Sequence, residues 1–164
     1  MTKIFAHRGA SAYAPENTME AFELAAKQGA DGIELDVHVT KDGEVVVTHD
    51  EKIDRVSNGS GFIKDMTLRE LKRLSFHNHM ESYVGAGIPT LREVLEYVST
   101  TNMDVNIELK TGIYWYPQIE EKTAFIVQET GMHDRVIYSS FNHHSIAKLK
   151  EIDLSLIHIS EPTR

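Results

Sequence analysis

The sequence predicts an α/β fold in which helices cover a largely parallel sheet. Two observations support this prediction: β-rich runs alternate with helical patterns along the chain, and residues with helix-capping spacing stand at several helix starts. The chain has 164 residues, with 41% apolar and 26% charged residues. This length suits one domain with one hydrophobic core, and this composition is that of a globular protein.

The pattern assigns each element in turn. In order, we expect a strand over 3–6, a helix from Asn17 to Gly29, β runs over 32–40 and 45–47, a short helix opened by Thr67, a helix opened by Thr90, a strand over 104–110, a helix over 117–130, a strand over 136–141 and a helix over 142–152. Capping-box spacing marks three of the helix starts, at Asn17 with Glu20, Thr67 with Glu70, and Thr90 with Glu93. We interpret Asn17 as a residue of helix initiation alone.

The segment from 32 to 50 departs from this alternation. Only Lys41-Asp42-Gly43 separates its two β runs, which is too short for the crossover that joins parallel strands. We therefore expect an antiparallel hairpin with this turn at the bottom, in which Asp36 faces Thr48. That register brings His49, the next residue, close to the acidic side chains of the first run.

Glu34 and Asp36 are candidate ligands of a divalent cation. They are separated by one residue, so both side chains point to the same face of a strand. Two neighbouring anions in an apolar run repel each other and lose hydration unless a cation neutralises them. Oxygen ligands favour calcium, magnesium or manganese, although two surface acids on an edge strand would give the same pattern. His38 continues this face, and we expect it at the surface or behind the ligands.

Glu108 and Lys110 repeat this spacing at the end of another strand. The pair is consistent with a simple ion pair, or with a third carboxylate for the cation and a lysine for phosphate charge. Their place at a strand end favours the second interpretation, because barrel active sites lie at the carboxyl ends of the strands.

Two histidines also stand at strand ends. His7 precedes Arg8, whose planar guanidinium suits phosphate oxygens, and His49 closes the hairpin. Because histidine titrates near neutral pH, two of them could share the acid and base roles across a phosphodiester. Glu16 lies in the loop above the first strand and is a further candidate.

Composition excludes several other classes. The formal net charge of −8 argues against nucleic acid as a partner, because binding it needs clustered Lys and Arg. The absence of cysteine excludes disulfides and thiolate metal sites. No run approaches the roughly 20 apolar residues of a membrane span, and the first residues do not resemble a signal peptide. We therefore expect a cytoplasmic protein.

Six short motifs occur in a fixed order along the chain. They are His7-Arg8-Gly9, Pro15-Glu16-Asn17-Thr18, Glu34-Leu35-Asp36-Val37, Thr40-Lys41-Asp42-Gly43, His49-Asp50 and Glu108-Leu109-Lys110. Together they resemble the signature of the glycerophosphodiester phosphodiesterase family, over the chain from Lys3 to about Asp153. The resemblance implies a TIM-type (β/α) barrel of the phospholipase-C-like phosphodiesterase kind. It also implies hydrolysis of small glycerophosphodiesters to glycerol 3-phosphate and an alcohol.

The resemblance also implies roles for the candidate residues. Ca²⁺ or Mg²⁺ would be bound by Glu34, Asp36 and Glu108, acid–base catalysis would fall to His7 and His49, phosphate would be held by Arg8 and Lys110, and Glu16 would be an additional site residue. A related barrel hydrolase acting on lysophospholipids or phosphoinositides is the alternative within enzymes. A catalytically silent fragment or binding module is the alternative from another class, and the presence of all these residues argues against it.

The expected strands account for only part of such a barrel. A complete one has about 250 residues, and about five of its eight strands are recognisable here. We therefore interpret residues 1–153 as a partial barrel domain. Residues 154–164 resemble an in-frame translation of a sequencing adapter, and we interpret them as a non-native tail. An open arc of strands exposes sheet edges and part of its core, so we expect the chain as written to fold poorly and to be nearly inactive.

Overall fold

The computed structural model describes residues 2–152, so the expected tail over 154–164 lies outside the described residues. Within them every expected helix and strand is present, with ends that differ from the expected ones by a few residues. The elements are β1 (Phe5–His7), α1 (Met19–Lys27), β2 (Gly32–Val39), β3 (Val45–Val47), α2 (Leu68–Leu71), α3 (Leu91–Ser99), β4 (Asp104–Leu109), α4 (Ile119–Glu129), β5 (Val136–Ser139) and α5 (His143–Ile152).

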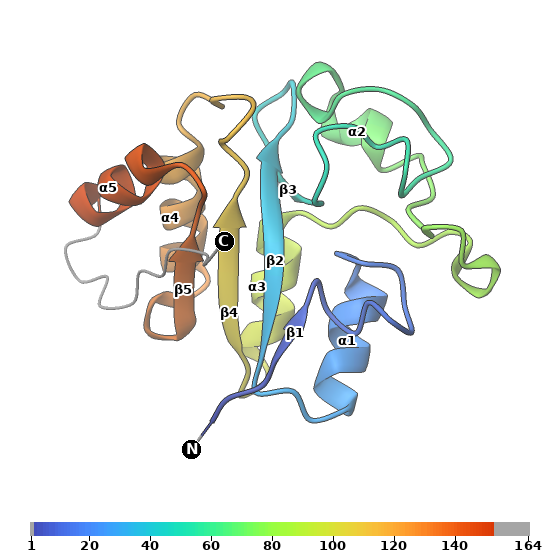
Figure 1. Ribbon diagram of the computed structural model, residues 1–164, viewed down its shortest axis with the longest axis horizontal. Helices are drawn as coiled ribbons and strands as arrows, with labels where there is room; N and C mark the ends of the chain where they lie inside the picture. The colour runs from blue at the N-terminus through green and yellow to red at the C-terminus, as the bar shows by residue number, and fades with distance from the viewer. Residues whose placement is uncertain (1, 153–164) are drawn as a thin grey trace.

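One five-stranded sheet organises the chain (Figure 1). Strands β1, β2, β4 and β5 lie side by side in that order and are all parallel, whereas β3 pairs antiparallel with the last residues of β2. The α/β prediction is thus confirmed. Consecutive parallel strands joined by helices are the arrangement of a (β/α) barrel.

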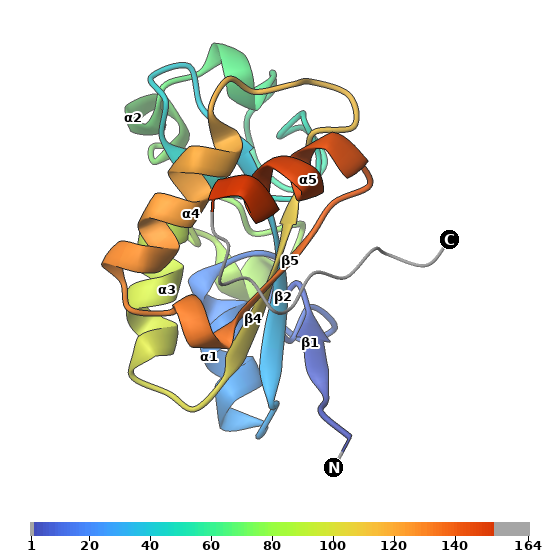
Figure 2. The same cartoon turned by 90° about the vertical axis from the view of Figure 1, so that its left-hand side faces the viewer.

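Helices α1, α3 and α4 lie on one face of this sheet (Figure 2). The side chains of Leu35, Val37 and Ile107 are fully buried in the hydrophobic core that includes residues of these helices. Because side chains alternate along a strand, the residues between them, including Asp36 and Glu108, point to the opposite face. Strand alternation therefore separates the apolar core from a polar face.

Residues 51–89 form a lobe between β3 and α3, with α2 and a hydrophobic cluster of their own. Six of its seven buried members come from the lobe itself, and the cluster comprises Val46, Ile53, Val56, Ile63, Leu71, Phe76 and Ile88. Val46, on β3, is the member that belongs to the sheet. The lobe thus packs against the sheet through the hairpin.

The predicted register of the hairpin is confirmed, but the predicted position of its turn is wrong. Val37 pairs with Val47, and the Thr48 amide donates to the Asp36 carbonyl at 3.0 Å. The turn over 40–44 follows the carboxyl end of β2 and projects beyond that edge of the sheet (Figure 1), rather than lying at the bottom. The reason is that parallel pairing with β1 and β4 fixes the direction of β2.

Two of the three expected capping boxes are confirmed. The side chains of Thr67 and Thr90 each accept from the backbone amide three residues later, and the glutamates at those positions bond back. The assignment of Asn17 as a helix-initiating residue is wrong, because Thr18 is the N-cap of α1. Over residues 2–152, no helix has the length and apolar content needed to cross a bilayer.

Candidate active site

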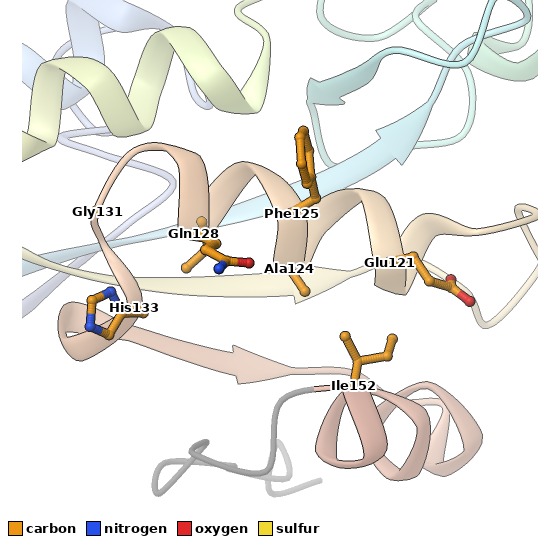
Figure 3. Close-up of a pocket in the computed structure, with 8 residues that line it drawn as sticks. Glu121, Ala124, Phe125, Gln128, Gly131, His133 and Ile152 are labelled. Atoms are coloured by element: carbon orange, nitrogen blue, oxygen red, sulfur yellow. The ribbon is translucent and has the colours of Figure 1, made fainter.

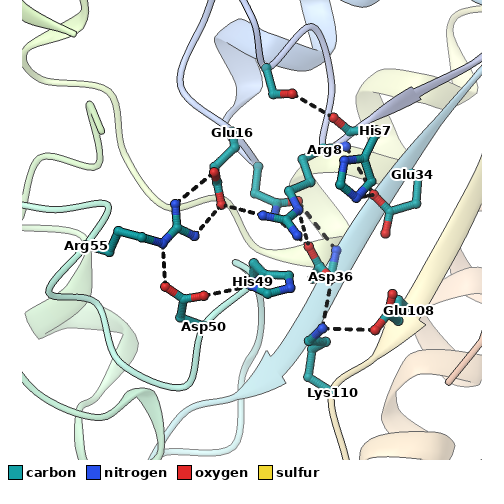
Figure 4. Close-up of polar contacts among 12 residues, drawn as sticks. His7, Arg8, Glu16, Glu34, Asp36, His49, Asp50, Arg55, Glu108 and Lys110 are labelled. Carbon is teal, nitrogen blue, oxygen red and sulfur yellow. Dashed lines mark hydrogen bonds and ion pairs between the residues drawn. The ribbon is translucent and has the colours of Figure 1, made fainter. Parts of the chain in front are cut away.

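Strands β2 and β4 bring three carboxylates together at one edge of the sheet (Figure 4). Asp36 pairs with Glu108 in the parallel register, and Glu34 projects from the same face of β2 two residues earlier. One carboxylate oxygen from each of the three lies within 4.8 Å of the others. Strand pairing therefore places Glu108 next to Asp36, although the two residues are distant in the sequence.

The electrostatic environment of this cluster suits a divalent cation. Asp36 is only 1% exposed and Glu34 9% exposed. Burial, together with the charges of Asp36 and Glu108, raises the pKa of Glu34 to about 7. A group of buried oxygens that repel one another in this way is a donor set for calcium or magnesium. The residues present therefore fit such an ion.

Two basic side chains flank the carboxylates. Lys110 Nζ lies 2.9 Å from Glu108 Oε1 and 3.5 Å from Asp36 Oδ1. On the other side, Arg8 Nε lies 3.5 Å from Asp36 Oδ2. Glu108 and Lys110 thus form the ion pair that the sequence leaves open, and the same glutamate also belongs to the acidic cluster.

The turn after β1 has a backbone conformation that glycine favours. Gly9 has φ +79°, and a Cβ at this position would lie 2.7 Å from the backbone carbon of Ala21. Arg8 precedes it with φ +57°, which is uncommon for a residue with a side chain. Its amide donates to the carbonyl of Glu34 at 3.0 Å and to Oε2 of that residue at 3.1 Å. These contacts dock the turn directly onto the acidic cluster.

Asn17 also belongs to this site. Its Nδ2 donates to Asp36 Oδ2 at 2.9 Å, and the side chain is buried. Its φ of +58° places the residue outside the helix and directs it to β2. The capping-box spacing with Glu20 is therefore misleading for Asn17, because its side-chain amide donates to a carboxylate of β2.

The two candidate histidines lie on different sides of the carboxylates. His7 pairs with Glu34 in the register of β1 and β2, and its Nε2 lies 3.8 Å from Glu34 Oε2. The side chain of His7 is largely exposed, at 69%. His49 Nδ1 lies 2.7 Å from Asp50 Oδ1. Since an ionised carboxylate only accepts hydrogen bonds, Nδ1 carries the proton and Nε2 remains for a ligand.

His38 is fully buried, so it is not at the surface. Its Nε2 donates to the backbone carbonyl of His49 at 3.0 Å, and its Nδ1 accepts from the hydroxyl of Tyr116 at 2.8 Å. Burial lowers the pKa of His38, which favours the neutral ring that this pattern requires. His38 therefore supports the backbone of His49 from behind.

Glu16 connects the two sides of the site. Its Oε1 accepts from Arg8 Nη1 at 3.1 Å and from Arg55 Nη2 at 2.7 Å, and its Oε2 accepts from Arg55 Nη1 at 3.0 Å. Arg55 also donates through Nε to Asp50 Oδ2 at 2.7 Å. Sequence reasoning missed Arg55, because it lies in the lobe outside the six motifs and its partner Glu16 is 39 residues away.

A small cleft opens beside the site. Its volume is about 250 Å³, and its lining includes the polar side chains of His49, Glu108 and Lys110 and the apolar side chains of Ile113 and Phe141. A larger hollow of about 610 Å³ lies between α4 and α5 (Figure 3). None of the candidate site residues lines that hollow, whereas His49, Glu108 and Lys110 line the smaller cleft.

Comparison with known proteins agrees with this geometry. The model of the glycerophosphoryl diester phosphodiesterase family matches residues 7–160. A glycerophosphodiester phosphodiesterase of Caldanaerobacter subterraneus subsp. tengcongensis is 51% identical over 152 residues, which cover 92% of this chain and 63% of the relative. One of Bacillus altitudinis is 52% identical over 149 residues, which cover 90% of this chain and 61% of the relative. The chain thus spans about six tenths of the length of these relatives.

Solved structures share the fold. A glycerophosphodiester phosphodiesterase from Agrobacterium tumefaciens matches with a TM-score of 0.88 and 38% identity, covering 98% of this chain and 67% of that one. An Oleispira antarctica phosphodiesterase, in complex with its product sn-glycerol 3-phosphate, matches with a TM-score of 0.89 and 31% identity, over 98% and 65% of the two chains. The sheet and its helices are therefore part of a TIM-type barrel, as the sequence predicts.

Proposed function

Because this chain belongs to the glycerophosphodiester phosphodiesterase family, we propose that its site hydrolyses glycerophosphodiesters to glycerol 3-phosphate and an alcohol with the help of a divalent cation. One observation carries the proposal: the acidic cluster lies between two phosphate-binding side chains and two imidazoles, all at the carboxyl edge of the sheet (Figure 4). The Oleispira relative, with its bound product, supports glycerol 3-phosphate as the product here.

Glu34, Asp36 and Glu108 would hold the cation, for which we propose calcium or magnesium. Such an ion, when bound, neutralises the charge that develops on the phosphoryl group and lowers the pKa of an attacking hydroxyl. Hydrogen bonds orient two of these carboxylates, because Asn17 donates to Asp36 and the amide of Arg8 donates to Glu34.

Arg8 and Lys110 bind the phosphate. They contact the acidic cluster from opposite sides, so a phosphate placed over the cluster meets a cationic group on each flank. The planar guanidinium of Arg8 suits two phosphate oxygens, whereas the ammonium of Lys110 acts as a point charge.

His7 and His49 transfer the protons. One imidazole removes a proton from the attacking hydroxyl of the glycerol, and the other protonates the oxygen of the departing alcohol as its bond to phosphorus breaks. Water then opens the resulting cyclic phosphodiester with the two roles exchanged, which gives glycerol 3-phosphate. For His49 the reacting nitrogen is Nε2, because Asp50 occupies Nδ1. The cleft next to His49 gives the alcohol a place to leave, between Ile113 and Phe141.

Turnover and cation binding test this proposal together. In a protein extended to the length of the relatives, His7→Ala and His49→Ala should each abolish release of glycerol 3-phosphate from glycerophosphocholine while cation binding persists. Exposed His79 provides the matched control, and His79→Ala should leave both unchanged. Full turnover in either active-site variant would contradict the assignment.

Substrate competition separates the related hydrolases. The extended protein should prefer glycerophosphocholine to lysophosphatidylcholine and to a phosphoinositide. Preference for either lipid would favour the alternative barrel hydrolase. Cation binding without turnover of any of the three would favour a binding module.

A further inference from the structure

Arg55, in the lobe, connects Glu16, in the loop after β1, with Asp50, which follows β3 (Figure 4). Its guanidinium uses three nitrogens at once: Nε donates to Asp50 Oδ2 at 2.7 Å, while Nη1 and Nη2 donate to the two carboxylate oxygens of Glu16 at 3.0 and 2.7 Å. The contact with Glu16 is the bidentate pairing for which the planar guanidinium is suited. Lysine would not reproduce it, because its ammonium is a single point.

Both carboxylates that Arg55 holds have a second partner in the site. Asp50 uses its other oxygen for His49 Nδ1 at 2.7 Å. Glu16 accepts from Arg8 Nη1 at 3.1 Å. Arg55 is therefore connected through a single carboxylate to the histidine that transfers a proton, and through another to the arginine that binds phosphate.

The charges agree with this arrangement. Burial would raise the pKa of Glu16 and of Asp50, but hydrogen bonds from Arg55 and its charge, with help from Arg8 at Glu16 and from His49 at Asp50, hold both below their ordinary values. Both carboxylates therefore stay ionised at neutral pH and act only as acceptors. An ionised Asp50 is what keeps the proton of His49 on Nδ1.

We propose that Arg55 is a positioning residue of the active site, which fixes the tautomer and orientation of His49 through Asp50 and the orientation of Arg8 through Glu16. This inference rests on the proposed function for the roles of His49 and Arg8. Arg55 itself does not touch the reacting atoms. Its side chain is 44% exposed, so replacing it leaves no large buried cavity.

The tautomer of His49 tests the proposal without any turnover. In the protein extended to the length of the relatives, ¹⁵N resonances of the His49 imidazole should show a protonated Nδ1 and an unprotonated Nε2 at a pH where the ring is neutral. Arg55→Gln should mix the two tautomers, and Arg55→Lys should do so in part. Arg69→Gln, at an exposed position on α2, is the matched control and should change nothing. An unchanged His49 spectrum in folded Arg55→Gln would overturn the proposal.

Kinetics of the extended protein give the second readout. Arg55→Gln should lower kcat/KM by roughly 10- to 100-fold, the usual effect of removing a residue that orients a ligand-binding group. The double variant that adds Asp50→Asn to Arg55→Gln should lower kcat/KM by less than the product of the two single fold-changes, because both substitutions act on His49. Strict additivity would overturn the proposal. If no variant or wild type turns over a diester, the proposed function fails, while the tautomer of His49 still decides the role of Arg55.

Discussion

Cation binding should release protons, because the cation and a proton compete for Glu34. Burial and the neighbouring carboxylates raise the pKa of Glu34 to about 7, so this side chain is largely protonated at pH 6 in the absence of an ion. A calcium or magnesium ion requires the ionised carboxylate. The affinity for the cation should therefore rise as the pH increases through 7, and it should level off above that value.

The size of the effect follows from the pKa. With a value of about 7, roughly one Glu34 side chain in ten is ionised at pH 6 and roughly nine in ten at pH 8. The affinity should therefore differ by about tenfold, or about 1.4 kcal/mol, between these pH values. Binding at pH 7 should release about half a proton for each ion.

Isothermal titration calorimetry measures both quantities. Titrations at pH 7 in two buffers of different ionisation enthalpy give the number of protons released, and titrations at pH 6 and pH 8 give the change in affinity. Glu34→Gln should weaken binding and remove the proton release, whereas the exposed control Glu129→Gln should do neither. Equal affinity at pH 6 and pH 8 in the wild type, with no proton release at pH 7, would refute the reasoning.

Three further substitutions, made in the extended protein, test the scaffold by chemical denaturation or thermal melting followed by circular dichroism. Gly9→Ala should destabilise the chain by about 1–3 kcal/mol, because φ is +79° and the new Cβ would meet the backbone of Ala21; a wild-type midpoint would contradict this. Thr90→Ala removes the cap of α3 and should cost about 1 kcal/mol, whereas the same stability as wild type would mean that the cap is dispensable. Tyr116→Phe leaves the buried Nδ1 of His38 without its donor and should cost about 1–3 kcal/mol, a prediction that an unchanged free energy of unfolding would exclude.

Local patterns account for what the sequence predicts well. The cap at Thr90 is set by residues three positions apart, and a turn of three residues leaves the hairpin a single plausible register. The sequence also predicts the acidic cluster, because alternation along β2 puts Glu34 and Asp36 on one face and the carboxyl ends of parallel strands meet at one edge of a sheet. Roles for these side chains stay predictions until the experiments above are done.

Long-range contacts account for what the sequence misses. Asn17 has the spacing of a helix start, yet its amide is bound by a carboxylate of β2. His38 has the appearance of an isolated polar residue, yet it bridges Tyr116, 78 residues away, and the backbone of His49. Arg55 has no local signal at all, since both the lobe and the first loop must fold before it meets Glu16. In each case the decisive partner is remote in sequence.

The separate hydrophobic cluster of the lobe has a consequence for how this protein can change. The carboxylates that would hold the cation stand on strands of the main core, whereas Arg55 belongs to the lobe, whose hydrophobic cluster includes Val46 of β3. Repacking in residues 51–89 should therefore act first on the alignment of His49, and it can reach the cation ligands through Glu16 and Arg8. Engineers who wish to alter catalytic rate have in this lobe a region whose hydrophobic cluster is separate from the core that underlies the cation centre.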